Sequence, residues 1–227
     1  MVSLITEGSA TDDRGRPFRR RRVVPAAVAG AVLAAGTIVV WSSVFTSSEP
    51  VTTTVACNAP PTEATDPEGP QPAPLGEVVD RSTLLEVEPA PLTATRVRVY
   101  NANGERGQAT HVAAQLSDYG FSSPPDVQAG NDPVYVDQNM QCQGQIRFGE
   151  AGRAAASSVW LLAPCAELVQ DTREDDTVDL ALGTYFRDIS PGADAEEVLR
   201  ALREVPAGEE TAPLDLDLLT AARNARC

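Results

Sequence analysis

Hydrophobic positions follow two different patterns along this chain. Residues 23–45 form one continuous apolar run without a charged side chain, whereas beyond residue 95 the apolar positions alternate or recur every three to four residues. A run of that length would span about 34 Å as a helix, enough to cross the hydrocarbon core of a bilayer. The run therefore predicts a single transmembrane helix, and the later pattern predicts a small folded domain.

The charges that flank the apolar run predict its orientation. Residues 1–22 contain six Arg and three acidic residues, and four of those Arg abut the run directly. Arg-rich flanks stay in the cytoplasm, so we expect a basic cytoplasmic tail at 1–22 and an extracytoplasmic location for everything after Phe45. Two alternatives stay open. One is a cleaved signal peptide, whose apolar region is usually shorter, and the other is a lipoprotein modified at Cys57.

The charge of the chain is unevenly distributed. The whole chain carries -14, and residues 1–22 carry +3, so the part beyond residue 45 carries -17. Such an acidic segment binds nucleic acid poorly, and it would need bridging divalent cations to bind phosphate-rich polymers. We therefore expect no nucleic-acid partner, and a neutral glycan or a protein partner instead. A chain of 227 residues has room for one ordinary domain with tails, which excludes a multi-domain enzyme.

Residues 46–94 are rich in Pro, Thr and acidic residues and poor in large apolar side chains. Such a stretch cannot bury enough surface to offset the entropy of ordering it, so the composition predicts a Pro-rich flexible linker. Within it, only Leu84, Leu85 and Val87 could form one short docked strand or helix.

The folded domain is expected at 95–186, with an α+β fold. Alternation in Arg96–Asn101 predicts a strand, and apolar residues recurring from Ala109 to Leu116 predict a helix that ends near Gly120. A crossover through this helix favours parallel pairing of the strand at 96 with a strand at 146, in a small sheet with helices on one face. The remaining predicted elements are strands at 134–136, 145–148, 166–170 and 177–182 and a helix from Ala154 to Pro164.

Two further features complete the expected organisation. The charged turn 171–176 indicates that the strands at 166–170 and 177–182 form an antiparallel hairpin. Residues 187–227 predict a helical C-terminal extension with one helix through Leu202 and a last helix through Leu216 and Ala222. Helices this short are marginal alone, so they must pack against the domain.

Several fixed spacings in the first half of the domain resemble the LytR C-terminal domain family. The strand Val97–Asn101, a glycine turn, a helix and a Gly-Phe exit follow one another, with matching residues at Gly107, Ala109, Val112, Ala113, Leu116, Gly120 and Phe121. Together with the anchor and linker, this resemblance implies a membrane-anchored protein of actinobacteria that contributes to cell envelope integrity. It implies binding of cell-wall components or envelope membrane proteins.

The four cysteines, Cys57, Cys142, Cys165 and Cys227, all follow the apolar run. Disulfides persist outside the cell, so we expect these cysteines to be oxidised. Four cysteines allow three connectivities, and our preferred interpretation pairs Cys142 with Cys165 and Cys57 with Cys227. A zinc site is not expected, because the chain has no C-x-x-C pair and only one His.

No candidate catalytic residues emerge from the sequence, so we expect no enzyme activity and no cofactor or metal. His111 is expected to face solvent, and no G-x-S-x-G motif is present. The acidic run 174–176 lacks the spacing of a calcium loop. The alternative is an accessory subunit or enzyme of cell-wall glycopolymer ligation.

Two groups of residues are candidates for ligand contact. The loop that follows the first strand could present backbone amides near a helix start, and its candidate ligand-facing residues are Asn101, Asn103, Gly104 and Gly107. Sugar binding normally requires exposed aromatic faces, for which the candidates are Tyr100, Tyr119, Tyr135 and Trp160. A third interpretation of the chain is a SPOR-like glycan-binding module.

Overall fold

The computed structural model describes residues 56–64, 68–205 and 214–223, together with Arg14, Pro25, Val28 and Leu33. The chain divides into two compact units, Met1–Val51 and Thr52–Cys227. In the first unit, the three described residues of the apolar run are helical. The rest of the predicted span at 23–45 lies outside the described residues. No helix found among the residues that are described is both long and apolar enough for a membrane crossing.

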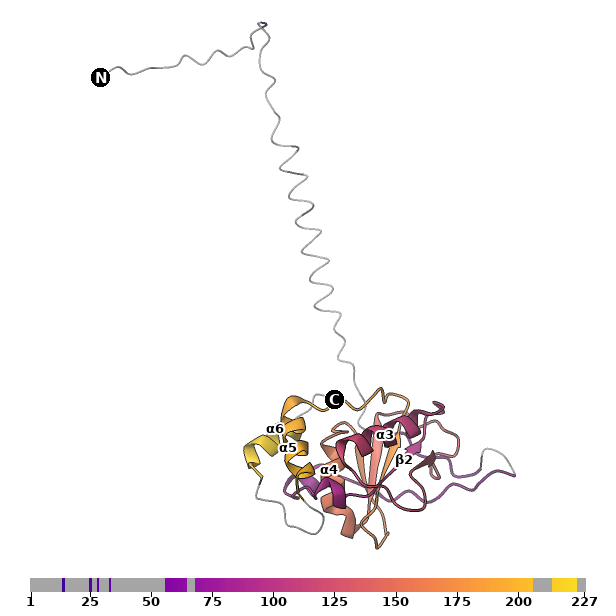
Figure 1. The fold of residues 1–227 in the computed structure, drawn as a ribbon. Coiled ribbons are helices and arrows are strands. Elements are labelled where there is room, and N and C mark those ends of the chain that lie inside the picture. Colours follow the sequence, from indigo (N-terminus) through magenta and orange to yellow (C-terminus); the bar gives the residue numbers. More distant parts are fainter. Residues whose placement is uncertain are drawn as a thin grey trace. The chain divides into compact units, whose positions relative to one another are not determined.

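A mixed six-stranded sheet forms the centre of the second unit (Figure 1). The strands lie in the order β1-β5-β4-β6-β2-β3. Strand β2 is parallel to both β3 and β6, and β4 is parallel to β5, whereas β4 with β6 and β1 with β5 are antiparallel pairs. The bounds are β1 Glu77–Val79, β2 Val97–Asn101, β3 Ala129–Asn131, β4 Gly144–Phe148, β5 Glu167–Gln170 and β6 Val178–Leu182. The expected α+β fold is thus confirmed for the folded unit.

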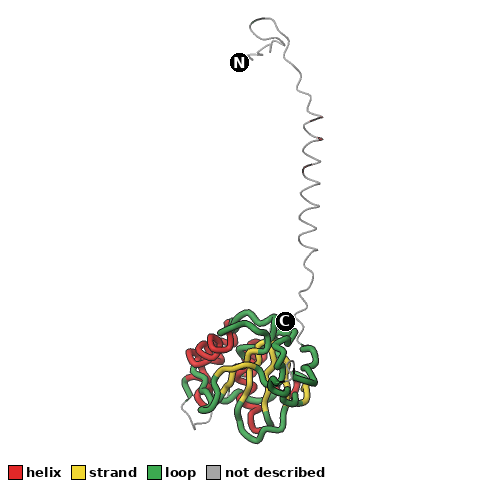
Figure 2. Tube along the Cα trace, turned by 90° about the vertical axis from the view of Figure 1, so that its right-hand side faces the viewer, coloured by secondary structure: helices red, strands yellow, loops and turns green. Residues whose placement is uncertain are grey.

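The described part of this unit also contains five α-helices (Figure 2). They are α2 Ser82–Leu85, α3 Gln108–Tyr119, α4 Arg153–Trp160, α5 Ala193–Arg203 and α6 Leu216–Arg223, and 3-10 helices occupy Leu92–Ala94 and Glu150–Gly152. The predicted end of the first helix is confirmed, because Gly120 adopts φ 107° and its N–H donates to the carbonyls of Leu116 and Ser117. A left-handed backbone conformation at the end of a helix favours glycine.

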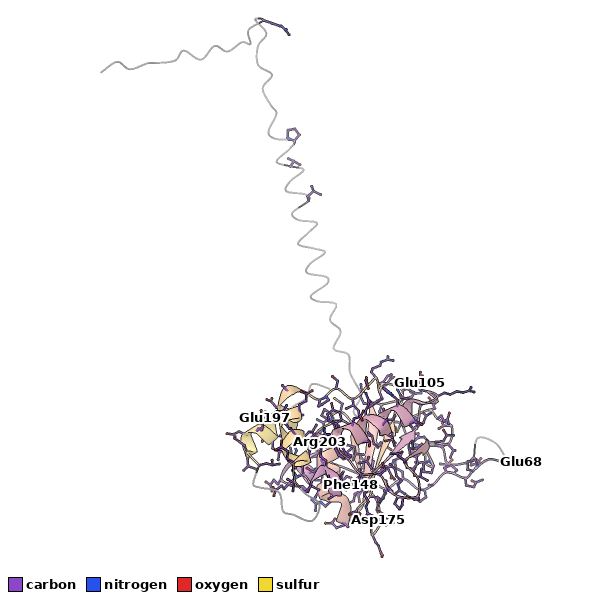
Figure 3. The ribbon with its side chains drawn as sticks, in the orientation of Figure 1. Glu68, Glu105, Phe148, Asp175, Glu197 and Arg203 are labelled. Carbon is purple, nitrogen blue, oxygen red and sulfur yellow. A yellow bond between two sulfur atoms is a disulfide. The ribbon has the colours of Figure 1, made fainter. Side chains whose placement is uncertain are left out.

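One face of the sheet and the helices share a single apolar core. Alternation along the strands places residues such as Val99, Ile146 and Phe148 on that face, and all three are fully buried. Figure 3 shows Phe148 inside the unit, with Glu105 and Glu197 at its periphery. The two C-terminal helices contribute Val198, Leu202 and Leu219 to the same core, so they pack as expected.

The strand order corrects two predicted pairings. β5 and β6 do not form a hairpin, because β4 lies between them. The connecting residues 171–177 cross the end of β4, where Asp171 N–H donates to the Phe148 carbonyl at 2.9 Å. A side chain at Gly149 would meet the Arg173 carbonyl at 2.1 Å, so only glycine permits this crossing. Similarly, β2 and β4 are not parallel neighbours, because β6 separates them.

The strand predicted at 134–136 is wrong. The edge strand is instead β3, at Ala129–Asn131. Directly after it, the carboxylate of Asp132 accepts the N–H groups of Val134 and Tyr135, both at 2.7 Å. A side-chain acceptor that captures two consecutive N–H groups turns the chain, so these residues cannot form a ladder.

The C-terminal part of the predicted linker is folded, which corrects its expected flexibility. Strand β1 pairs with β5, and Leu84 and Leu92 are fully buried in the core. At Gly76 the chain lies so close to the end of β5 that an added Cβ would be 2.2 Å from the Gln170 carbonyl oxygen. Few apolar residues sufficed, because each fills a site prepared by the rest of the domain. The docked element expected near Leu84 is confirmed as helix α2.

Candidate functional site: the polar face of the sheet

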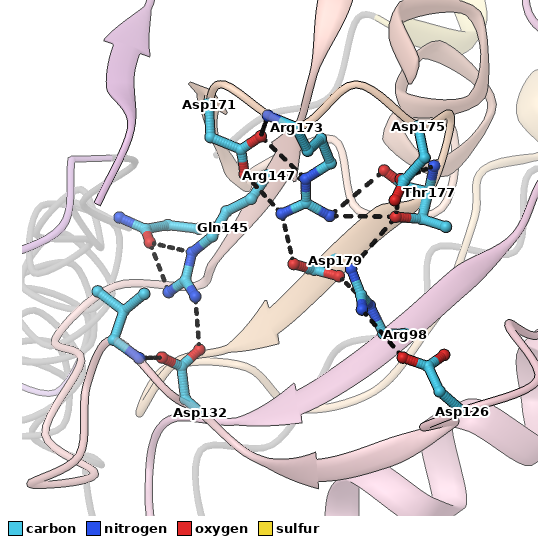
Figure 4. Close-up of polar contacts among 11 residues, drawn as sticks. Arg98, Asp126, Asp132, Gln145, Arg147, Asp171, Arg173, Asp175, Thr177 and Asp179 are labelled. Carbon is cyan, nitrogen blue, oxygen red and sulfur yellow. Dashed lines mark hydrogen bonds and ion pairs between the residues drawn. The ribbon is translucent and has the colours of Figure 1, made fainter. Parts of the chain in front are cut away.

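Charged residues from three adjacent strands meet on the face of the sheet opposite the helical core. Arg98 on β2 and Arg147 on β4 are both direct register partners of Asp179 on β6. Their side chains therefore share one face, since side chains alternate along each strand. Figure 4 shows these three residues within a larger set of polar contacts.

Asp179 bonds two arginines at once. Its Oδ1 lies 2.7 Å from Arg98 Nε, and its Oδ2 lies 2.6 Å from Arg173 Nη2. Burial disfavours the charged form of Arg98, but the neighbouring Asp179 carboxylate outweighs this and raises the pKa of Arg98. Arg98 also approaches the exposed Asp126 at 3.5 Å and donates to Thr177 Oγ1 at 3.2 Å.

Arg173 reaches the same carboxylate from the connection between β5 and β6. Its Nη2 also lies 2.5 Å from Asp171 Oδ2, and its Nε lies 2.9 Å from both oxygens of Asp171. Burial alone would raise the pKa of Asp171, but the hydrogen bonds and positive charge of Arg173 lower it instead. The pKa of Arg173 is raised, because Asp171 and Asp179 outweigh its desolvation. The connection is therefore pinned to the sheet by paired charges.

The acidic run 174–176 belongs to the same connection. Asp175 Oδ1 accepts the Thr177 N–H at 2.9 Å, and Asp176 pairs with Arg96. Hydrogen bonds to Thr177 lower the pKa of Asp175. Within the described part of the chain, no group of three or more His, Cys, Asp or Glu side chains could hold a metal ion.

Arg147 anchors a second, more deeply buried cluster. Its Nη1 lies 2.8 Å from Asp132 Oδ2, and the two side chains are only 4% and 0% exposed. Its Nε and Nη2 donate to Gln145 Oε1 at 3.0 and 2.9 Å, and its guanidinium carbon lies 5.8 Å from the Tyr135 ring centroid. Gln145 Nε2 in turn donates to Glu167 Oε2 at 2.7 Å.

Residues 57 and 58, where the chain enters the folded unit, contact this second cluster. Cys57 N–H donates to Glu167 Oε1 at 3.2 Å, and the Tyr135 hydroxyl donates to the Asn58 carbonyl. Burial raises the pKa of Tyr135 to about 12, against the opposing charge of Arg147. The buried carboxylates of Asp132, Glu167 and Asp179 thus each have a hydrogen-bonding or ionic partner.

Sequence reasoning missed this polar face. Its signal is a charged or amide residue at the alternate positions of otherwise apolar strands, as in Arg98, Gln145, Arg147 and Asp179. Alternation identifies two faces for each strand but does not show that these residues become neighbours. That depends on the strand order, which places β6 between β2 and β4.

The predicted ligand-facing loop is closed by its own hydrogen bonds. Asn101 Oδ1 accepts the N–H groups of Asn103 and Gly104 at 3.1 and 3.0 Å, and its Nδ2 donates to the Glu105 carbonyl at 2.9 Å. Asn103 Nδ2 donates to the Gly183 carbonyl at 2.8 Å. Gly104 and Gly107 both have positive φ, at 80° and 79°, as tight turns require. A ligand-facing role for this loop stays a prediction.

The structure also gives the exposure of His111 and of the four aromatic candidates. His111 is exposed on α3, as predicted. Tyr135 and Trp160 are fully buried, so they cannot serve as exposed platforms for sugar rings. Tyr100 and Tyr119 are half-buried and keep that option.

The disulfide pairing preferred from the sequence is wrong. Cys57 is bonded to Cys142, with 4.8 Å between their Cα atoms, so neither Cys142–Cys165 nor Cys57–Cys227 forms. Cys165 is also disulfide-bonded, and Cys227 lies outside the described residues. The packing of residues 57–64 and 68–94 onto the domain explains the error, because it brings Cys57 beside the loop that carries Cys142. The expectation of oxidised cysteines is confirmed for Cys57, Cys142 and Cys165.

The domain that carries this face belongs to a recognisable class of protein. Residues 94–186 match the family model described as LytR cell envelope-related transcriptional attenuator. Over 203 residues the chain is 48% identical to the cell envelope integrity protein Cei of Mycobacterium tuberculosis (strain ATCC 25618 / H37Rv), covering 89% of this chain and 91% of the relative. The chain therefore belongs to the family of this cell envelope integrity protein.

A solved structure supports the same assignment. The crystal structure of the soluble domain of a conserved hypothetical secreted protein from Mycobacterium marinum is 47% identical in sequence and superposes with a TM-score of 0.61. The match covers 68% of this chain and 100% of that one. The relative's whole domain therefore corresponds to part of this chain.

Proposed function

We propose that this chain is a membrane-anchored, non-enzymatic protein that contributes to cell envelope integrity. In this proposal the folded domain lies outside the cytoplasm and binds wall components or envelope proteins. The apolar run at 23–45 with its Arg-rich flank supports the anchor and orientation. The names of the relatives, an envelope integrity protein and a secreted protein, support the location and the role.

The pairing of charges on the polar face carries the non-enzymatic part of the proposal. Asp132, Asp171, Asp179 and Glu167 each bond an Arg, an amide or a backbone N–H. A general acid or base must be able to exchange a proton with a substrate, which a buried and paired carboxylate does poorly. Such a network instead holds a rigid surface for recognition.

The part of this face that stays accessible is the best candidate for contact with a partner. The side chain of Arg98 is 20% exposed and that of Asp126 is 60% exposed. Tyr100 is half-buried and lies on β2, two positions from the residue that pairs with Asp179. Guanidinium, carboxylate and phenol groups together suit a neutral polar ligand such as a glycan. The net charge of -17 beyond residue 45 disfavours a polyanionic ligand.

Two assays on the purified soluble part of the chain test this function. The first measures release or transfer of labelled wall polymer with and without divalent metal, and we expect no turnover. The second measures retention on wall fragments and on solubilised envelope proteins, and we expect binding that Asp126→Asn weakens. Ser117→Ala, at an exposed position on α3, is the matched control. Metal-dependent or metal-independent turnover would favour the alternative, a role in glycopolymer ligation.

A further inference from the structure

The chain enters the folded unit at a fixed point. Cys57 is held by its disulfide to Cys142 and by its N–H bond to Glu167. The next side chain, Asn58, donates to the Asn139 carbonyl at 3.0 Å and accepts the Gln141 N–H at 2.6 Å. Residues 57 and 58 therefore pack against the loop that carries Cys142 and form one surface with it.

This fixed point shortens the tether that composition suggests. The predicted span ends at Phe45, so only residues 46–56 separate it from Cys57. Eleven residues reach at most about 40 Å when fully extended. A folded unit of this size is itself about 40 Å across. An anchored chain would therefore keep its entry point within about one domain diameter of the bilayer.

The two segments that meet at the entry point contain no charged residue, although the chain beyond residue 45 carries -17. They are residues 56–62 and 138–145. Asn139 and Gln141 are exposed and bonded to each other at 3.2 Å, while Gln138, Gln143 and Asn58 are half-buried. The acid that precedes this run, Asp137, accepts the Asn139 N–H at 3.3 Å. We call Asn58, Gln138, Asn139, Gln141 and Gln143 the amide surface.

We propose that the amide surface is the face that the domain turns toward the headgroup layer of its own membrane. This inference rests on the membrane anchoring proposed above. Anionic lipids repel acidic surfaces at short range, whereas an uncharged surface meets no such repulsion. Amide side chains also donate to phosphate oxygens and accept from headgroup hydroxyls and amines. A short tether raises the effective concentration of this surface at the bilayer.

Hydrogen–deuterium exchange on the full chain tests the proposal. The protein is reconstituted in nanodiscs of phosphatidylcholine and phosphatidylglycerol, and exchange is followed in peptides that cover 57–60 and 137–143. We expect slower exchange there than in a variant with a twenty-residue Gly/Ser insert between Pro50 and Val51. The same insert between Glu68 and Gly69 lies after Cys57, so it does not lengthen the tether and should leave the slowing intact.

Charge variants sharpen the test. The double variant Asn139→Asp, Gln141→Glu places two negative charges on the amide surface and should abolish the slowing in anionic nanodiscs. Ser117→Glu, on the opposite side of the sheet, should not. Equal exchange in the native and tether-lengthened chains would overturn the proposal. Flotation of the full chain with liposomes separates this outcome from failure of anchoring, because an unanchored chain would not float at all.

Discussion

Arg98 and Asp179 are direct partners across the β2–β6 pair, and Arg98 Nε lies 2.7 Å from Asp179 Oδ1. The other oxygen of the same carboxylate bonds Arg173, which comes from the connection that crosses β4. One carboxylate thus links two strands and a loop. Its side chain is only 9% exposed, so the charges it balances are poorly solvated.

Asp179→Asn should destabilise the domain by about 3 kcal/mol, because it leaves two partly buried arginines short of a carboxylate. Urea unfolding of the purified domain measures this loss. Glu150→Gln is the control, since its partner Arg153 lies at 3.2 Å but the Glu150 side chain is 72% exposed. The control should change the free energy of unfolding by less than about 0.5 kcal/mol. Equal losses in the two variants would contradict the role of Asp179.

The raised pKa of Tyr135 predicts that the folded domain loses stability at high pH. Its pKa in the folded protein is about 12, above the ordinary value near 10. The folded state holds the proton more tightly, so this contribution is complete below about pH 10 and is lost as the pH rises through 12. The chain has no Lys, and its described cysteines are oxidised, which leaves Tyr as the main side chain titrating there.

Thermal unfolding as a function of pH checks this expectation. The Tyr135→Phe variant should show a shallower decline between pH 10 and 12 than the native domain, although it is less stable at neutral pH. Tyr185→Phe, at a 44% exposed position, is the control and should follow the native curve. An unchanged alkaline slope in Tyr135→Phe would show that another group causes the decline.

Arg223 holds the last helix through contacts with two other segments, residues 85–87 and helix α4. Its guanidinium donates to the carbonyls of Leu85 and Val87 and to Ser157 Oγ, and its carbon lies 5.4 Å from the Trp160 ring centroid. Desolvation lowers its pKa. Arg223→Ala should cost about 3 kcal/mol, because buried acceptors lose their donor.

Arg223→Lys should fall between the alanine variant and the native protein, since one ammonium group cannot reach all of these acceptors in the same geometry. Arg187→Ala, at an exposed position, is the control and should have little effect. Thermal unfolding of the three variants orders them. A lysine variant as unstable as the alanine variant would show that charge at this position contributes nothing.

The Cys57–Cys142 disulfide closes a sequence separation of 85 residues. In the chain-entropy account, a loop of this length makes the bond worth about 4.6 kcal/mol. The double variant Cys57→Ser, Cys142→Ser should lose a stability of that order in denaturant unfolding. Non-reducing peptide mapping of the native chain should recover the two cysteines in one linked fragment. Recovery of Cys142 linked to Cys165 would contradict the pairing.

The elements of this fold follow from local pattern. Alternation located the strand at Val97 and the strand at Ile146, three-to-four spacing located helix α3, and Gly120 marked where it ends. The fixed spacing of these signals also identified the family. Local pattern suffices here because each element must present one apolar face, and that requirement is written in neighbouring residues.

The candidate site was much harder to predict. Arg98, Arg147 and Asp179 are far apart in the sequence, and each alone reads as an ordinary solvated charge. They become one cluster only because β6 lies between β2 and β4. Likewise, the composition of residues 77–94 predicted flexibility, since it ignores the buried sites that Leu84 and Leu92 fill.

By itself, the sequence determined the apolar run, the α+β elements, the family and the oxidised cysteines. Only the tertiary structure decided which strands are neighbours, which charges pair, where the linker ends and that Cys57 joins Cys142. The physical reason is that periodicity and composition report how each segment meets solvent or core, whereas pairing depends on free energy shared between segments distant in the chain.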